Sequence, residues 1–114
     1  MKDDSVYINQ ILDGVSKIES FVLDMSYDRF EKDQKTQSAV IMQLMLIGET
    51  AKKISDKKKR TIDLPWKDIA GFRDMAIHNY FAMDLDIVWN TMQEDIPFLK
   101  KKLMDFRSWA ATLV

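Results

Sequence analysis

Apolar side chains recur every three or four residues along most of the chain, and this spacing restricts the possible folds more than any other feature. The first such stripe consists of Tyr7, Ile11, Val15, Ile18, Val22 and Met25. This is the period of an α-helix with one buried face. No segment shows a convincing alternation of apolar and polar residues, and no internal repeat is visible. The pattern therefore predicts an all-α protein, an antiparallel bundle of four to five helices.

The same spacing predicts the bounds of the later helices. The expected segments are residues 36 to about 55, residues 64 to between 78 and 81, the residues after 84, and a last segment that Pro97 kinks or restarts and that runs to about residue 112. Thr36 and Asp84 are predicted N-caps, because both side chains can accept a hydrogen bond from a free backbone amide. Residues 26–35 are expected to be a connection that Tyr27 and Phe30 hold against the core.

The helix expected over residues 36–55 is apolar on nearly all sides. Its first apolar face consists of Val40, Leu44, Ile47, Ala51 and Ile54, and a second consists of Ile41, Met42, Met45 and Leu46. A surface helix of a monomer has no reason to carry two apolar faces. Either this helix is central to the bundle, or it also forms a subunit interface.

Length and charge narrow the function classes. A chain of 114 residues fits one domain, so residues 1–114 are expected to form a single helical domain. With 17 basic and 18 acidic side chains the net charge is -1, which argues against a general, charge-driven binder of nucleic acids or membrane surfaces. The basic run at residues 57–60 is interpreted as a solvated helix end rather than an RNA contact.

Cysteine usage and the first residues add two expectations. The chain has no cysteine, which excludes disulfides, thiolate metal sites and cysteine nucleophiles. Residues 1–6 lack the basic and then apolar profile of a signal peptide, and the longest apolar stretch is too short to cross a bilayer. We therefore expect a cytoplasmic protein without membrane contact.

Chemically active groups are few and lie close together in the sequence. His78 is the only histidine, and no phosphate-binding loop, nucleophile elbow or zinc motif accompanies it, so we expect no metal site and no cofactor. The remaining candidates are Arg73, Asp74, His78 and Tyr80, which helical geometry places at or beyond the border of the buried face. Asp74 precedes His78 by one turn, so its carboxylate can hold one ring nitrogen of the histidine.

These residues also have a purely structural interpretation. Arg73 and Asp74 can form a surface ion pair, and His78 can end the helix with a charge that suits its dipole. Tyr80 can be an aromatic that closes the helix end. However, an Arg five residues before the only His and a Tyr two residues after it form a rare coincidence in an arbitrary chain. The spacing therefore favours a functional interpretation.

This spacing resembles the signature of the HEPN superfamily, and in particular of the HepT-like toxins of bacterial and archaeal toxin–antitoxin pairs. In that signature an Arg and a polar residue are followed by His and Tyr, at the positions of Arg73, Asp74, His78 and Tyr80. Further similar segments are Lys35-Thr36-Gln37, Ile47-Gly48-Glu49, Pro65-Trp66, Ile69-Ala70-Gly71, Tyr80-Phe81, Val88-Trp89 and Glu94-Asp95-Ile96-Pro97, so the resemblance covers about residues 7–105. Asp74 stands where the family commonly has Asn. Asn79 stands where Gly is common and is expected at a left-handed helix end.

The resemblance implies a metal-independent endoribonuclease that acts as a toxin. Arg73 would bind phosphate, His78 would be the general acid and base, and Asp74 would orient His78. Arg73, Asn79 and Tyr80 would contact the RNA substrate. Because one histidine per chain is too few, a homodimer would bring two copies into one cleft.

The resemblance also implies a partner, an MNT-type nucleotidyltransferase antitoxin. In the family this partner transfers AMP to the tyrosine of the motif, which is Tyr80 in this chain. The added bulk and negative charge would block the cleft where RNA phosphate binds.

Two other functions stay open. The first is a non-catalytic helical subunit that binds a nucleotide or docks a nucleotidyltransferase without cutting RNA. The second is a purely structural helical dimer. RNA cleavage by the purified protein separates the first from the toxin interpretation, and replacement of Arg73 and His78 tests the second.

Overall fold

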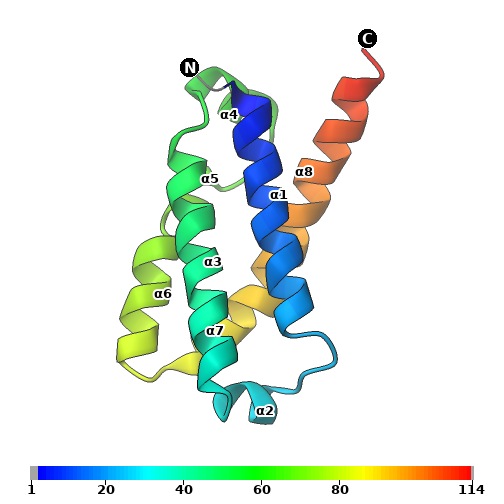
Figure 1. Cartoon of the computed structure of the whole chain (residues 1–114). Helices are drawn as coiled ribbons and strands as arrows, with labels where there is room; N and C mark the ends of the chain where they lie inside the picture. Colours follow the sequence, from blue (N-terminus) through cyan, green and yellow to red (C-terminus); the bar gives the residue numbers. More distant parts are fainter. Residues whose placement is uncertain (1–2, 114) are drawn as a thin grey trace.

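The computed structural model describes residues 3–113, and Figure 1 shows that they fold into a bundle of helices. The elements are α1 (Asp4–Phe21), α2 (Tyr27–Glu31), α3 (Gln34–Lys52), α4 (Asp56–Thr61), α5 (Trp66–Ala70), α6 (Phe72–Phe81), α7 (Leu85–Asn90), the π-helical turn η1 (Thr91–Asp95) and α8 (Ile96–Ala111). The longer helices α1, α3, α6 and α8 alternate in direction, and no strand occurs within residues 3–113. The predicted all-α fold is confirmed.

Helix α3 is the central element of the bundle. It packs against α1 on one side and against α5 and α6 on the other. Val40, Leu44 and Ile47 on α3 are almost completely buried. This agrees with the first of the two explanations for its two apolar faces. The second face is not fully covered, because Met42 and Leu46 remain 53% and 49% exposed.

The bounds of the first helix differ from those of its apolar stripe, which extends from Tyr7 to Met25. Asp3 caps α1 by accepting hydrogen bonds from the backbone amides of Ser5 and Val6. The helix ends at Phe21, and the chain turns through Asp24, which has a φ of 58°. Met25 was expected on the helical stripe; it lies beyond the helix and still packs against the core.

The connection over residues 26–35 contains a short helix that the periodicity did not predict. Ser26 caps α2 by accepting a hydrogen bond from the backbone amide of Arg29. Phe30 is fully buried, and its ring and that of Tyr27 pack against Trp89. The predicted role of the two aromatics is confirmed, whereas a helix of five residues is too short to show a period.

The predicted N-cap of the second long helix was wrong by three residues. Asp33 caps α3, because its carboxylate accepts the backbone N–H of Thr36 at 3.0 Å and the Thr36 hydroxyl at 2.7 Å. The helix ends at Lys52 rather than near Ser55. Ser55 instead caps α4, the separate short helix that carries the basic run at residues 57–60.

The expected third helix is divided into α5 and α6 at Gly71. Both pieces pack against α3 at Gly48, where the backbones approach so closely that a Cβ atom would meet Ile69, Ala70 and Arg73. Only a residue without a side chain, as at Gly48, allows this close backbone contact. Phe72 and Ala76 on α6 are buried and hold this helix in place.

The last part of the chain follows the prediction in outline. Pro97 stands in the first turn of α8, so the helix restarts there after η1. Asp84 is the N-cap residue of α7, as predicted, but its carboxylate accepts no capping hydrogen bond from that helix. Within residues 3–113, none of the helices has the length and apolar character needed to cross a membrane.

Candidate functional site

Helix α6 carries the motif residues, and its two sides differ sharply. Phe72, Ala76 and Asn79 are buried. Asp74 and His78 are exposed on the opposite side, and Arg73 is partly exposed beside them. As the sequence predicted, the charged groups of the motif lie at or beyond the border of the buried face.

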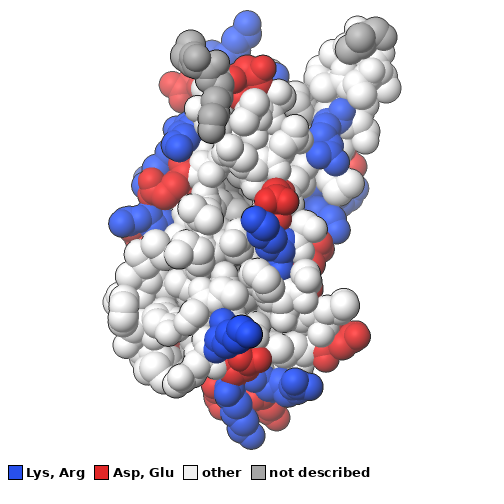
Figure 2. Space-filling view, in the orientation of Figure 1, with Lys and Arg blue, Asp and Glu red and all other residues white. Residues whose placement is uncertain are grey.

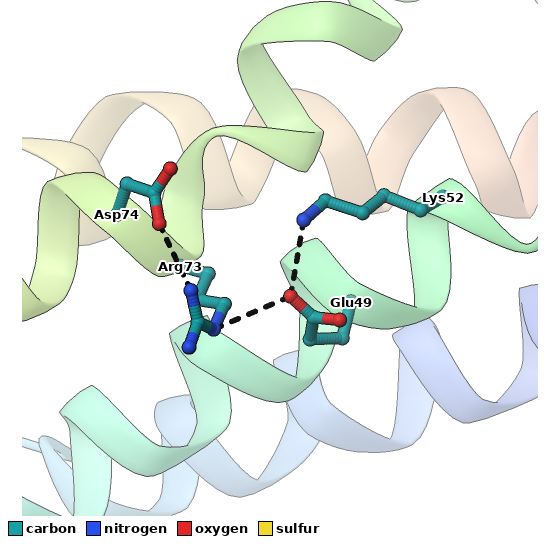
Figure 3. A network of polar contacts seen from close by, with 4 residues as sticks. All are labelled: Glu49, Lys52, Arg73 and Asp74. Carbon is teal, nitrogen blue, oxygen red and sulfur yellow. Dashed lines mark hydrogen bonds and ion pairs between the residues drawn. The ribbon is translucent and has the colours of Figure 1, made fainter.

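Arg73 is held by two carboxylates (Figure 3). Its Nε lies 3.3 Å from Oε1 of Glu49 on α3, and its Nη1 donates to Oδ1 of Asp74 at 3.1 Å. The same Glu49 oxygen accepts a hydrogen bond from Lys52 Nζ at 3.1 Å. All four side chains are substantially exposed, 43% for Arg73 and 81% for Asp74. Exposed pairs of this kind contribute about 0–1 kcal/mol each.

The expected hydrogen bond between Asp74 and His78 is not among the contacts of residues 3–113. The Asp74 carboxylate pairs with Arg73 instead. A different acid, Asp84, is close enough to His78 for their charges to interact. The pKa of Asp84 is raised chiefly by a hydrogen bond with the carboxyl of Asp86, while the positive charge of His78 acts to lower it.

Asn79 does not have the expected conformation. It lies inside α6, and the left-handed residue after that helix is Met83, with a φ of 61°. The Asn79 side chain is buried, and its Nδ2 donates to the backbone carbonyl oxygen of Met75 at 2.8 Å. The backbone carbonyl oxygen of Asn79 accepts the backbone N–H of Asp84, also at 2.8 Å. Its amide therefore stabilises the end of the helix rather than facing a ligand.

Tyr80 combines a packed ring with a hydroxyl group at the surface. The ring packs against the core and meets the ring of Phe81 edge to face, with centroids 5.5 Å apart. The hydroxyl group lies 3.3 Å from the hydroxyl of Ser38 on α3, a surface contact. The phenolic oxygen is therefore positioned at the rim of the α3–α6 contact, at the protein surface.

Sequence reasoning missed Glu49, Lys52 and Ser38 as neighbours of the motif. All three lie on α3, far from the motif in sequence. One signal was present, because Gly48 interrupts an apolar helix and a glycine at such a place often marks a close backbone approach. A helix that crosses at Gly48 brings its own polar residues next to Glu49.

The motif lies on an open helix side rather than in a cavity of the chain. Two hollows of the described residues, of about 490 and 530 Å³, are lined by other side chains. No group of three or more His, Asp or Glu side chains within residues 3–113 is placed to hold a metal ion. The chemistry available on this surface is that of a guanidinium, an imidazole, carboxylates and a phenol.

Comparison with known proteins identifies relatives over nearly the whole chain. Residues 11–106 match the family model described as "Ribonuclease HepT-like". A protein of Thermococcus cleftensis named "Probable ribonuclease HepT" is 40% identical over 89% of this chain and 93% of its own. A protein of Caldanaerobacter subterraneus, whose name makes it a candidate RNase, is 33% identical over 92% of this chain and 95% of its own. No solved structure matches.

Proposed function

The chain belongs to the HepT-like ribonuclease family, and we propose that it is a metal-independent endoribonuclease, the toxin of a toxin–antitoxin pair. One observation carries this proposal. A guanidinium, an imidazole and a phenol hydroxyl, from Arg73, His78 and Tyr80, all reach the surface of α6. Two copies of these groups supply what RNA cleavage by the neighbouring 2′-hydroxyl needs, which is a base, an acid and positive charge.

In the proposed reaction, the imidazole of one His78 takes the proton of the 2′-hydroxyl group. The 2′-oxygen attacks the phosphorus atom, and the bond from phosphorus to the 5′-oxygen breaks. The His78 of a second copy, in its protonated form, donates a proton to that leaving oxygen. The products are a 2′,3′-cyclic phosphate and a 5′-hydroxyl end. Arg73 stabilises the charge that builds up on the phosphoryl oxygens.

The reaction needs two copies of the chain, because each carries a single histidine. A two-fold dimer that brings two α6 helices together places both His78 side chains in one cleft. Figure 2 shows a broad area without charged side chains over α3 and α6, at the lower left. The exposed apolar side chains of this part of the chain are Met42, Leu46, Phe81 and Met83. A dimer would bury such a surface.

The carboxylates around Arg73 do not prevent this function. Glu49 and Asp74 hold the guanidinium at the surface through pairs that are exposed to solvent and weak. A phosphate of the RNA can replace Asp74 as the partner of Nη1, because a phosphate also accepts two parallel hydrogen bonds from a guanidinium. Glu49 then remains as the group that positions Arg73.

Neutralisation is proposed to occur at Tyr80, by a nucleotidyltransferase antitoxin that uses ATP. The Tyr80 oxygen attacks the α-phosphorus of ATP, the bond to the departing pyrophosphate breaks, and the phenolic proton passes to solvent. The surface position of the hydroxyl group, beside Ser38, supports this assignment. The transferred AMP carries negative charge on the same helix as Arg73 and so repels RNA phosphate.

One observation favours a second candidate, a helical subunit that docks a nucleotidyltransferase without cutting RNA. In the single chain the guanidinium of Arg73 is already neutralised by the carboxylates of Glu49 and Asp74. These two negative charges also repel phosphate. This function needs the exposed surface of α6 but not the chemistry of His78.

Product analysis separates the two candidates. Purified protein is incubated with a single-stranded RNA in EDTA, and the new RNA ends are identified by mass spectrometry. We expect 2′,3′-cyclic phosphate and 5′-hydroxyl ends. Intact RNA, together with binding of the nucleotidyltransferase, would support the docking subunit instead.

A further inference from the structure

The basic run, residues 57–60, and the C-terminal half of α8 together form a surface that the proposed reaction does not use. In Figure 1 α4 and the end of α8 lie at the top of the bundle, whereas α6 lies in its lower half. The bundle is 47 Å along its longest axis, so the two surfaces are separated by much of the length of the molecule. A function at this end is independent of Arg73 and His78.

The cations on α4 differ from five other described cations in their partners. Lys17, Lys52, Arg73, Lys100 and Lys101 each form an ion pair with a carboxylate. No such pair is found for residues 57–60 within the described part of the chain. The carboxylates whose pKa the charge of Lys58 helps to lower, those of Asp3 and Asp4, already accept hydrogen bonds from Ser5 and Ser55. Lys58 itself lies over an aromatic ring, with Nζ 4.9 Å from the centroid of Phe106.

Next to these cations the surface contains a hollow of about 350 Å³. One wall is Thr61, Ile62 and Asp63, and the other is Lys102, Asp105, Phe106 and Trp109. The rings of Phe106 and Trp109 are 5.7 Å apart, and Trp109 is 56% exposed although it is a large aromatic. The hollow thus offers an accessible indole face with cations at its edge.

We propose that this hollow, defined by Asp63, Lys102, Phe106 and Trp109, binds a base of single-stranded RNA and holds the substrate away from the cutting site. Exposed aromatic rings beside a positively charged surface are the usual platform for unpaired bases, which stack on the ring while cations contact the phosphates. The proposal rests on the proposed function, since it takes RNA to be the substrate.

Charge within the hollow agrees with a nucleotide rather than with a simple polyanion. Asp105 is tied to Lys101 at 3.0 Å, so Asp63 and Lys102 are the lining charges for which no ion pair is found in the described part of the chain. A carboxylate can accept a hydrogen bond from the amino group of a base, while Lys102 and residues 57–60 provide the positive charge for the backbone. A membrane surface would not benefit from the carboxylate.

The first test measures binding without cleavage. In a His78→Ala background, a fluorescent single-stranded RNA is titrated and its anisotropy recorded. Trp109→Ala should raise the Kd about fivefold or more, and Trp109→Phe should restore most of the affinity, because a phenyl ring still stacks. Lys58→Gln combined with Lys59→Gln should weaken binding and flatten its salt dependence. Lys17→Gln, which removes a cation from α1, serves as the control.

Binding of RNA with equal affinity by the Trp109→Ala, Trp109→Phe and parent proteins would overturn the proposal. A titration with anionic lipid vesicles is run in parallel. Equal binding of vesicles and RNA, weakened by the lysine changes but not by the change of Trp109, would also overturn the proposal. Asp63→Asn tests whether the carboxylate contacts a base. If it does, loss of the charge should change the preference among bases more than the overall affinity. A uniform gain of affinity for all bases would mean that Asp63 merely repels phosphate and contacts no base.

A second measurement separates this proposal from the cleavage function. In the active protein, Trp109→Ala should raise the KM for a long RNA and leave the KM for a dinucleotide unchanged, because a dinucleotide cannot occupy both surfaces. If the parent protein cuts no RNA, the proposed function fails, while the binding titration still decides the base site. If it cuts RNA and KM is independent of Trp109 at both lengths, the base site fails alone.

Discussion

The backbone nitrogen of Arg73 lies where it does because residue 48 is a glycine. A Cβ atom on Gly48 would lie 2.9 Å from that nitrogen, closer than real Cβ contacts come. The contact brings the start of α6 against α3, and it places the Arg73 guanidinium beside Glu49, with Nε 3.3 Å from Oε1. One backbone contact therefore sets the position of the charged group that is proposed to bind RNA phosphate.

Gly48→Ala should move α6 and destabilise the fold. The new methyl group meets the Arg73 nitrogen and the Ala70 carbonyl oxygen, which are backbone atoms and cannot rotate away. We expect a loss of about 1–3 kcal/mol in unfolding free energy, measured by urea denaturation.

The matched control is Gly14→Ala. Its methyl group would meet side-chain atoms, of Ile47 at 3.1 Å and of Gln43 at 3.5 Å, and alanine favours the helix by up to about 1 kcal/mol. We expect this variant to be nearly as stable as the parent protein. Equal losses for both variants would contradict the special role of the Gly48 contact.

Asp74→Asn should improve RNA binding. The change removes a negative charge that pairs with Arg73 Nη1 at 3.1 Å and leaves the guanidinium to phosphate. Because the pair is exposed, we expect KM to fall by about two- to fivefold with kcat unchanged. Steady-state kinetics and the pH profile of kcat check this. A large fall in kcat with a shifted pH profile would instead show that Asp74 orients His78.

Tyr80→Phe should prevent neutralisation while preserving the fold. The substitution removes only the surface contact with Ser38, so unfolding free energy should change by less than about 0.5 kcal/mol. After co-expression with the nucleotidyltransferase, intact-mass analysis should find added AMP on the parent protein and on Tyr27→Phe, the control, but none on Tyr80→Phe. AMP on the Tyr80→Phe protein would place the modification elsewhere.

Asp95→Asn should stabilise the protein at neutral pH. Burial raises the pKa of Asp95 above the ordinary 3.8, and the charges of Glu94 and Asp68 act in the same direction. Protonation therefore favours the folded state, and this contribution is lost as pH rises from 3.8 through the higher folded pKa. The Tm of Asp95→Asn should exceed that of the parent at pH 7, and the difference should vanish at acidic pH. Asp13→Asn is the control, and a pH-independent difference would contradict this cause.

The sequence was informative about the long helices and silent about the short ones. The stripes of α1 and α3 extend over five turns or so, enough to show a period. Helices α2 and α4 have five and six residues, and their existence depends on the caps Ser26 and Ser55 rather than on a stripe. The N-cap of α3 was misplaced because Asp33 and Thr36 are both good caps, and the structure uses the first to hold the second.

The candidate site shows the same division between local and tertiary information. The exposure of Arg73 and His78 follows from their angle on one helix, which the sequence contains. Their partners do not follow from it, because Glu49 reaches Arg73 only through the packing of α6 on α3. Asn79 was placed at a left-handed helix end by analogy with a glycine, whereas α6 continues past it to Phe81.

The central claim is that Arg73 and His78 cut RNA without a metal ion. The most direct measurement is cleavage of a single-stranded RNA in EDTA by the parent protein, Arg73→Ala and His78→Ala, each first shown to have the parent Tm. We expect cleavage by the parent protein and a loss of about 100-fold or more for each variant, since acid–base catalysis alone contributes that much. Cleavage at the parent rate by both variants, or activity that EDTA abolishes, would contradict the account.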